Sequence, residues 1–213
     1  MNLSHTGCIA DDFTYGDDLS LGEYVIVEPN VKVGNGVKIG HRVTLKSGTM
    51  VGDNSIIDDH CITTGACVVG NHVNVRTGAI ISKATIIEDY CFIGPGVITN
   101  HTKHVSHGRE DKISERQLLT YICFGSIVGS QASILAGVSI GSQVIVGGGT
   151  VVVKDLEGKG VYVGSPAKRK MELPAEYLMP EPEKAGVMYL TEEILYHLKE
   201  HIPNLELPDS FVR

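Results

Sequence analysis

A six-residue repeat of aliphatic residues runs through most of the chain. Every sixth position from Leu21 to Thr99 belongs to it, and the same spacing resumes from Ile122 to Val152. Val, Ile or Leu fills 18 of these 20 positions; because such residues total 59 of 213, random placement would fill between five and six. Six matches neither the period of a helix nor strand alternation, but it fits a short strand followed by a turn of about two residues. The repeat therefore predicts a coiled all-β structure.

Three such units would make one triangular coil of about 18 residues, and stacked coils would pair edge to edge. The aliphatic residue should point inward, together with the small or β-branched residue found four places later in the first run. Glycine often follows the aliphatic residue, as at Gly34, Gly52 and Gly70, and we expect it to mark turns. The pattern closely resembles the hexapeptide-repeat family. That resemblance, and not the period, implies a left-handed parallel β-helix, which we expect to have about seven coils.

The chain divides into a solenoid domain and an extension. We assign residues 1–170 to the β-helix domain, with a polar, histidine-rich loop of residues 100–121 inserted where the register shifts, and residues 171–213 to a C-terminal extension. Such a loop on a rigid scaffold is a common place for function. The extension should hold one amphipathic helix, packed on the solenoid or on a neighbouring subunit, because apolar residues recur there at helical spacing. They are Leu190, Ile194, Leu195, Leu198 and Ile202.

Charge and composition narrow the partners. The net charge of −7 argues against nucleic acid as a partner, and no apolar run is long enough to predict a membrane span. The first residues lack the basic and apolar regions of a signal peptide. Three of the five cysteines, Cys61, Cys67 and Cys91, take the inward small position, so disulfides are not expected. We therefore expect a cytoplasmic protein.

One segment after the repeats resembles a cofactor-binding segment. The residues Gly164, Ser165, Pro166, Ala167, Lys168 and Arg169 closely resemble the end of the β-helix in hexapeptide acyltransferases, although serine replaces the more usual asparagine. In that family the segment folds back beside the final coils and helps to hold coenzyme A, which implies that Ser165, Pro166, Lys168 and Arg169 bind the cofactor. A basic cluster suits a phosphorylated adenosine; a solvated charge run is the alternative interpretation.

Small residues precede that segment. Residues 125–149 are rich in glycine, alanine and serine, and small side chains at outer corners let a ligand approach the backbone. We therefore add Ala136, Gly148 and Lys154 to the expected contacts with acetyl-CoA. Tight turns alone are the other explanation of this composition.

The loop offers histidines for acid–base chemistry. Acyl transfer from a thioester requires a base for the acceptor, and histidine titrates near neutrality. We expect His101, which directly follows the regular repeats, to be this base, with His104 as the alternative. In the related nucleotide-sugar N-acetyltransferases the sequence at this point is Thr-Asn-Asp, whereas this chain reads Thr99-Asn100-His101. Asn100 matches that branch and His101 departs from it, which leaves amine and hydroxyl acceptors open.

Other site chemistries fit less well. Some hexapeptide-fold proteins resemble zinc carbonic anhydrases, but zinc needs three or four ligands at fixed geometry, and the spacing of His101, His104 and His107 differs from that pattern. His60 and His72 could join from neighbouring coils. We assign no metal ligands, and the phosphate-loop, H-E-x-x-H and C-x-x-C motifs are absent from the sequence.

These observations predict an acyl-CoA-dependent acyltransferase. The resemblance implies a homotrimer that uses acetyl-CoA to acetylate an amino group of a nucleotide-linked sugar for surface polysaccharide, with each site between two subunits. The alternatives are an O-acetyltransferase acting on a sugar or antibiotic hydroxyl, a zinc protein like the carbonic anhydrases, and a solenoid scaffold without catalysis.

Overall fold

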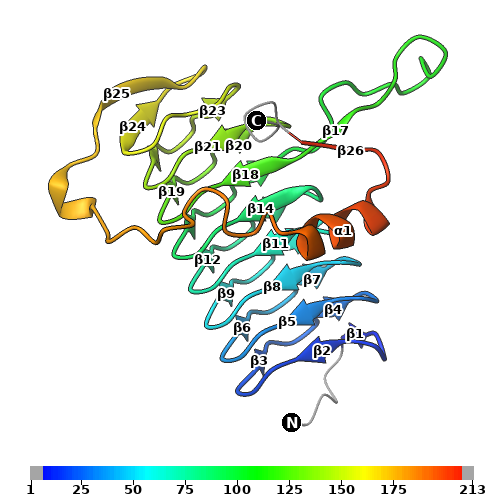
Figure 1. Cartoon of the computed structure of the whole chain (residues 1–213). Helices are drawn as coiled ribbons and strands as arrows, with labels where there is room; N and C mark the ends of the chain where they lie inside the picture. The colour runs from blue at the N-terminus through cyan, green and yellow to red at the C-terminus, as the bar shows by residue number, and fades with distance from the viewer. Residues whose placement is uncertain (1–6, 208–213) are drawn as a thin grey trace.

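The computed structural model describes residues 7–207 and shows a three-faced parallel β-solenoid (Figure 1). The first face consists of β1 (Cys8–Ile9), β4 (Ile26–Val27), β7 (Thr44–Leu45), β10 (Ile62–Thr63), β13 (Ile80–Ile81), β16 (Ile98–Thr99), β20 (Ser133–Ile134) and β23 (Val151–Val152). The second face consists of β2 (Thr14–Tyr15), β5 (Lys32–Val33), β8 (Met50–Val51), β11 (Val68–Val69), β14 (Thr85–Ile87), β18 (Thr120–Ile122) and β21 (Ser139–Ile140).

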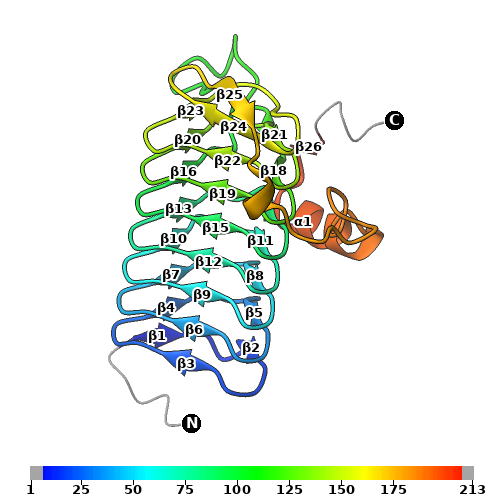
Figure 2. The same ribbon diagram turned by 90° about the vertical axis from the view of Figure 1, so that its left-hand side faces the viewer.

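The third face is closed by an antiparallel strand. It consists of β3 (Ser20–Leu21), β6 (Lys38–Ile39), β9 (Ile56–Ile57), β12 (Asn74–Val75), β15 (Phe92–Ile93), β19 (Ile127–Val128), β22 (Ile145–Val146), β24 (Gly160–Val163) and the antiparallel β25 (Lys168–Glu172). The chain visits the faces in order and climbs with a left-handed turn (Figure 2). The predicted left-handed parallel β-helix is confirmed.

The coil count is higher than predicted. The third face is nine strands deep, so the solenoid has about nine layers and not about seven. The extra layers come from both ends of the repeat: β1 and β2 already pair with β4 and β5, and β24 and β25 follow the last aliphatic position. Strand pairs need only two residues in register, so coils form beyond the stretch where the sequence repeat is regular.

The inward positions form the core as the repeat predicts. All of the aliphatic positions from Val27 to Val152 are buried, and Leu21 packs partly buried against them. The two exceptions, Thr63 and Thr99, are buried as well. Their hydroxyls lie 2.7 Å from Thr49 Oγ1 and 3.0 Å from Thr85 Oγ1. Each polar atom therefore finds a partner inside the core, as burial of a hydroxyl requires.

The inserted loop leaves the corner between the first and second faces. The pairing Ile87↔Ile122 spans 35 residues where a coil spans 18, as in Val69↔Ile87, so the insertion is 17 residues long. The chain leaves after β16, returns through β17 (Gln117–Leu118) and rejoins the solenoid at β18. The loop between them projects from the solenoid in Figure 1.

The C-terminal extension crosses the second face. After the 3₁₀ turn η1 (Ala175–Tyr177) it runs over the solenoid, forms helix α1 (Glu192–His201) and ends as β26 (Leu205–Glu206) beside β17. The Thr191 side chain caps α1 by accepting from the Ile194 amide at 3.3 Å. Leu198 and Ile202 are fully buried against the solenoid, which confirms the predicted amphipathic helix and its packing. Among residues 7–207, none of the helices is long and apolar enough to span a membrane.

Candidate active site

A groove of about 650 Å³ lies where the inserted loop meets the last coils and the C-terminal strand. Its walls come from the base of the loop, from two successive corners of the solenoid and from β26. Three predicted site residues, Asn100, Ala136 and Lys154, line it together. The sequence separates them by up to 54 residues (154 − 100), and the stacking of coils brings them to one place.

The loop base and the C-terminal strand hold each other. β17 pairs in parallel with β26, with Gln117 opposite Leu205 and Leu118 opposite Glu206. The Arg116 guanidinium forms an ion pair with the Glu206 carboxylate, whose two oxygens both lie 2.9 Å from Nε. Arg116 and Glu206 also line the groove, and sequence reasoning missed both. Only the pairing of the extension with the loop places them there.

Asn100 is held by the corner of the next coil. Its side-chain amide donates to the Ile134 carbonyl at 3.0 Å, its backbone amide donates to the same oxygen at 2.9 Å, and Thr120 Oγ1 donates to its carbonyl at 3.0 Å. These three bonds fix Asn100, the first residue of the loop. The side chain therefore enters the groove from a rigid position, which suits a group that orients a ligand.

His101 is half-buried at the foot of the loop. Its carbonyl accepts the Leu118 amide at 2.8 Å, which ties it to the returning strand. Burial lowers the pKa of His101 below its ordinary value, the positive charge of Lys83 lowers it further, and Glu115 acts in the opposite direction. The imidazole is therefore neutral near pH 7 and carries a lone pair, as a base requires.

The other loop histidines lie further out. His104 and His107 are both exposed. Within residues 7–207, the one set of three side chains close enough to share a metal ion lies on α1 and includes none of His101, His104 and His107. The structure gives His104 no buried position and no rigid partner comparable to those of His101, so His101 remains the stronger candidate for a base.

The segment that resembles a coenzyme A clamp forms the upper cap of the solenoid. The chain turns at Gly164, whose φ is +96°, and at the cis peptide between Ser165 and Pro166, and it then returns as β25. The Ala167 amide donates to the Val151 carbonyl at 2.8 Å, and the Ala167 side chain is buried. The segment thus folds back beside the final coils, as the resemblance implies, and this hairpin of residues 160–172 is fixed to the first face at Val151.

The two basic residues of the hairpin differ. Arg169 lies 2.7 Å from a Glu172 oxygen and 3.6 Å from a Glu157 oxygen, so acidic neighbours already balance its charge. Lys168 is exposed at the start of β25. An anionic ligand would have to compete with two carboxylates for Arg169. Lys168 is therefore the better placed of the two for a phosphate.

The predicted site does not come together within one chain. The hairpin with Ser165, Pro166 and Lys168 stands on one side of the upper solenoid and the inserted loop on the other in Figure 1. Gly148, also predicted to contact the cofactor, is exposed at a corner of the last coils, and neither it nor the hairpin lines the groove. The two predicted bases, His101 and His104, are not among the lining residues either. One chain thus supplies two separate halves of the predicted site.

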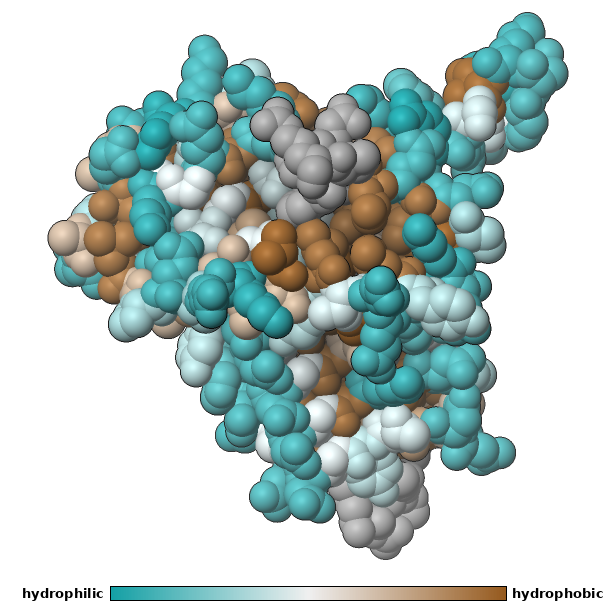
Figure 3. Space-filling view, viewed as in Figure 1, coloured by the Kyte–Doolittle hydropathy of each residue, from teal (hydrophilic) through white to brown (hydrophobic). Residues whose placement is uncertain are grey.

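A buried carboxylate fastens the extension to the second face. Glu88 is fully buried and accepts four hydrogen bonds: from Tyr121 Oη at 2.6 Å, Phe124 N at 2.7 Å, Gly186 N at 2.8 Å and Met188 N at 2.7 Å. Burial, and after it the Glu88 charge, raises the pKa of Tyr121 above its usual range, so this hydroxyl serves as a donor. Figure 3 shows apolar residues gathered beside the crossing extension.

Comparisons with known proteins place the fold. No protein-family model matches the chain, and no curated protein matches it. Among solved structures, the polySia-specific acetyltransferase NeuO is 20% identical, with a TM-score of 0.56 and coverage of 88% of this chain and 86% of that one. A mutant of AntD, an N-acyltransferase from Bacillus cereus, in complex with dTDP and coenzyme A, is 18% identical, with a TM-score of 0.55 and coverage of 76% and 85%.

A third similar structure carries the acetyl donor. A hexapeptide-repeat-containing acetyltransferase from Vibrio cholerae O1 biovar eltor, complexed with acetyl coenzyme A, is 20% identical, with a TM-score of 0.50 and coverage of 60% of this chain and 72% of that one. At these identities the similarity concerns the backbone. The chain therefore shares its fold with hexapeptide-repeat acyltransferases.

Proposed function

We propose that the protein is an acyltransferase that uses acetyl-CoA to acetylate an amino group on a nucleotide-linked sugar. The observation that carries this proposal is the base of the loop, where a rigid Asn100 lines the groove. The next residue, His101, is half-buried with a lowered pKa, and its side chain lies outside the lining of that groove. The hairpin that resembles a coenzyme A clamp and the solved acyltransferases of the same fold support it. The amine acceptor rests on the match of Asn100 to the N-acetyltransferase branch.

In this mechanism His101 takes a proton from the acceptor amine. The nitrogen lone pair attacks the thioester carbonyl, a new C–N bond forms and the carbonyl electrons move to oxygen. Collapse of this intermediate re-forms the carbonyl and breaks the C–S bond, and the departing thiolate receives the proton that His101 took from the amine. Asn100 would orient the amine. A neutral histidine with a low pKa can accept the proton at pH 7.

We also propose that a homotrimer completes the site. The first face is flanked on one side by the loop corner and on the other by the hairpin, which is bonded to Val151 of β23. That face also carries exposed isoleucines in one column, Ile26, Ile62 and Ile98. Threefold packing of neighbouring chains along this face would bring the loop of one copy to the hairpin of the next.

We further propose that the protein acts in the cytoplasm, where its five free thiols would stay reduced.

Calorimetric titration with acetyl-CoA and with CoA tests the proposal. We expect micromolar binding by the wild type and affinity reduced about tenfold or more in Lys168→Ala, since a hydrogen bond to a charged group is worth about 1.5–3 kcal/mol. Arg169→Ala should weaken binding less, because Glu172 and Glu157 hold that side chain. Lys38→Ala, an exposed lysine on the third face, is the control.

Steady-state kinetics with amino-sugar nucleotides then test the base. His101→Ala should lower kcat by about 10²–10⁴-fold and leave the affinity for acetyl-CoA unchanged. Absence of CoA binding by the wild type would refute the acyltransferase proposal. Full turnover by His101→Ala would refute the role of His101 and leave the rest intact.

A further inference from the structure

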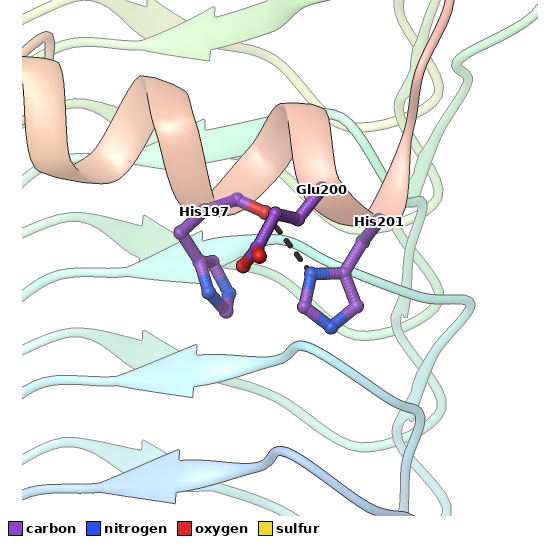
Figure 4. Close-up of side chains that lie close together, drawn as sticks. All are labelled: His197, Glu200 and His201. Carbon is purple, nitrogen blue, oxygen red and sulfur yellow. Dashed lines mark hydrogen bonds between the residues drawn. The ribbon is translucent and has the colours of Figure 1, made fainter.

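Three potential metal ligands gather on one side of α1. His197, Glu200 and His201 each place one donor atom so that all three atoms lie within 4.8 Å of one another (Figure 4). The two histidines are one helical turn apart, so their rings share a face, and they are 4.7 Å apart between ring centroids. Both rings are half-buried and Glu200 is exposed, which leaves the cluster open to an ion from solvent.

Hydrogen bonds select the tautomer of each imidazole ring. His197 Nε2 lies 2.8 Å from the Gly48 carbonyl oxygen, and His201 Nδ1 lies 3.0 Å from the His197 carbonyl oxygen. A carbonyl can only accept, so each of these nitrogens must carry the proton. The lone pairs then reside on His197 Nδ1 and His201 Nε2. A histidine that donates one ring N–H to a backbone carbonyl and keeps the other nitrogen for an ion is the usual arrangement around protein-bound metals.

We propose that His197, Glu200 and His201 form a binding site for a divalent transition metal of the zinc type. Two imidazoles and one carboxylate suit zinc, and also nickel and cobalt, whereas calcium and magnesium require oxygen ligands. Three protein ligands leave a position of a tetrahedral ion for water. The site is independent of the proposed acyl transfer, because it lies on the extension and shares no residue with the groove.

The bound ion would fasten the end of α1 to the solenoid. His197 bonds to Gly48 at the corner between β7 and β8, and the ring of His201 packs there too, since a Cβ on Gly48 would come within 2.7 Å of it. The chain reaches β26, one wall of the groove, four residues after His201. An ion that holds both rings in these rotamers therefore stabilises the end of α1 against the corner between β7 and β8. The chain continues from that end of the helix into β26.

Matched variants can remove each ligand atom and keep the hydrogen bond. In His197→Gln the side-chain amide nitrogen takes the place of Nε2 and can still donate to Gly48, but the Nδ1 ligand is gone. In His201→Asn the amide nitrogen replaces Nδ1 and the Nε2 ligand is gone. Glu200→Gln removes the carboxylate without changing its shape. His60→Asn, at an exposed corner where φ is +61° and asparagine is tolerated, is the control for binding by surface histidines.

The experiment titrates untagged full-length protein with Zn²⁺ against a chromophoric chelator and with Co²⁺ in the visible range. We expect one equivalent per chain for the wild type and for His60→Asn, and affinity reduced about 100-fold or more in each ligand variant. Zn²⁺ at one hundred times its Kd should raise the thermal midpoint of the wild type by about 5–10 °C and leave that of the ligand variants unchanged. Equal midpoints of all proteins without metal would show that the variants fold.

Two results would overturn the proposal. One is a wild type that binds Zn²⁺ no more tightly than the variant with all three ligands replaced. The other is a Co²⁺ spectrum that the His197→Gln and His201→Asn changes leave unaltered.

Discussion

Replacing Glu88 by glutamine tests how the extension is fastened to the solenoid. Glu88 Oε1 accepts from Tyr121 Oη and Met188 N, and Oε2 accepts from Phe124 N and Gly186 N. Each oxygen therefore serves one donor from the solenoid and one from the extension. Glutamine has the same shape but offers one acceptor oxygen and one NH₂ group, so two of the four donors must lose their partner.

The structure indicates which donors these are. Only the Tyr121 hydroxyl can rotate to accept a hydrogen bond, so the new NH₂ group should turn toward it. Met188 N then faces a donor, whereas Gly186 N keeps an oxygen. Loss of a hydrogen bond to a charged group costs about 1.5–3 kcal/mol, or about 10- to 160-fold in a local opening equilibrium. Gly186 N keeps an acceptor oxygen, but this oxygen no longer belongs to a charged carboxylate. The weaker hydrogen bond costs about 1 kcal/mol, or about fivefold in the local opening equilibrium.

Native-state amide hydrogen exchange measures both values. In Glu88→Gln the Met188 amide should exchange about 10- to 160-fold faster and the Gly186 amide about fivefold faster than in the wild type. Glu183→Gln removes the same charge from an exposed position of the extension and should change neither rate. If both amides exchange as in the wild type, apolar packing and not Glu88 holds the extension. If Gly186 accelerates more than Met188, the assigned orientation of the amide is wrong.

Two further predictions concern pH and thiol chemistry. Burial, and after it Lys83, lowers the pKa of His101 from its ordinary value of 6.5. The imidazole therefore loses its proton-accepting form only at a pH below 6.5. Acyl transfer should therefore persist above that lowered pKa and fall as pH drops through it, and Lys83→Met should move the acid limb of kcat/KM to higher pH; an unmoved limb would contradict the assignment. Burial raises the pKa of Cys61 to about 11, and of the five cysteines only Cys8 is exposed. Native protein at pH 8 should therefore alkylate fast at Cys8 alone, and mass spectrometry showing a second equally fast thiol would contradict the burial of the others.

The period of the inward positions made the solenoid predictable. The core needs an aliphatic residue at every sixth place, so Val27, Leu45 and Ile57 report the fold directly. The ends of the solenoid were not predictable in the same way. Ile9 of β1 stands opposite Val27 and packs against the core, but Tyr15 of β2 stands opposite Val33 where the repeat has an aliphatic residue. This interruption hides the first coil from the aliphatic repeat, so the prediction gave too few coils.

The docking of the extension leaves a signal at a different period. On the second face the outward residues one coil apart are Met50, Val68 and Ile86, with Tyr121 next after the insertion. These apolar positions lie in the cluster that packs against α1. Outward apolar residues at multiples of 18 also occur on the first face, at Ile26, Ile62 and Ile98, so this spacing marks two faces for packing and does not decide which of them the extension covers. The six-residue search examined only positions that point inward.

The extension connects the loop, the buried carboxylate and the helix into one mechanical unit. Glu88 holds the start of its crossing, the buried face of α1 holds the middle, and Glu206 pairs with Arg116 at the loop base. Asn100 and His101 follow the last strand before the loop, and β17, which returns from it, pairs with β26. The geometry at the foot of the loop therefore depends on residues about 100 positions away in the sequence. Motifs at residues 99–107 alone could identify candidate side chains, but they could not show what holds the backbone there. The solenoid holds Asn100 through Ile134 and Thr120, and the strand that returns from the loop is held by β26 near the end of the chain.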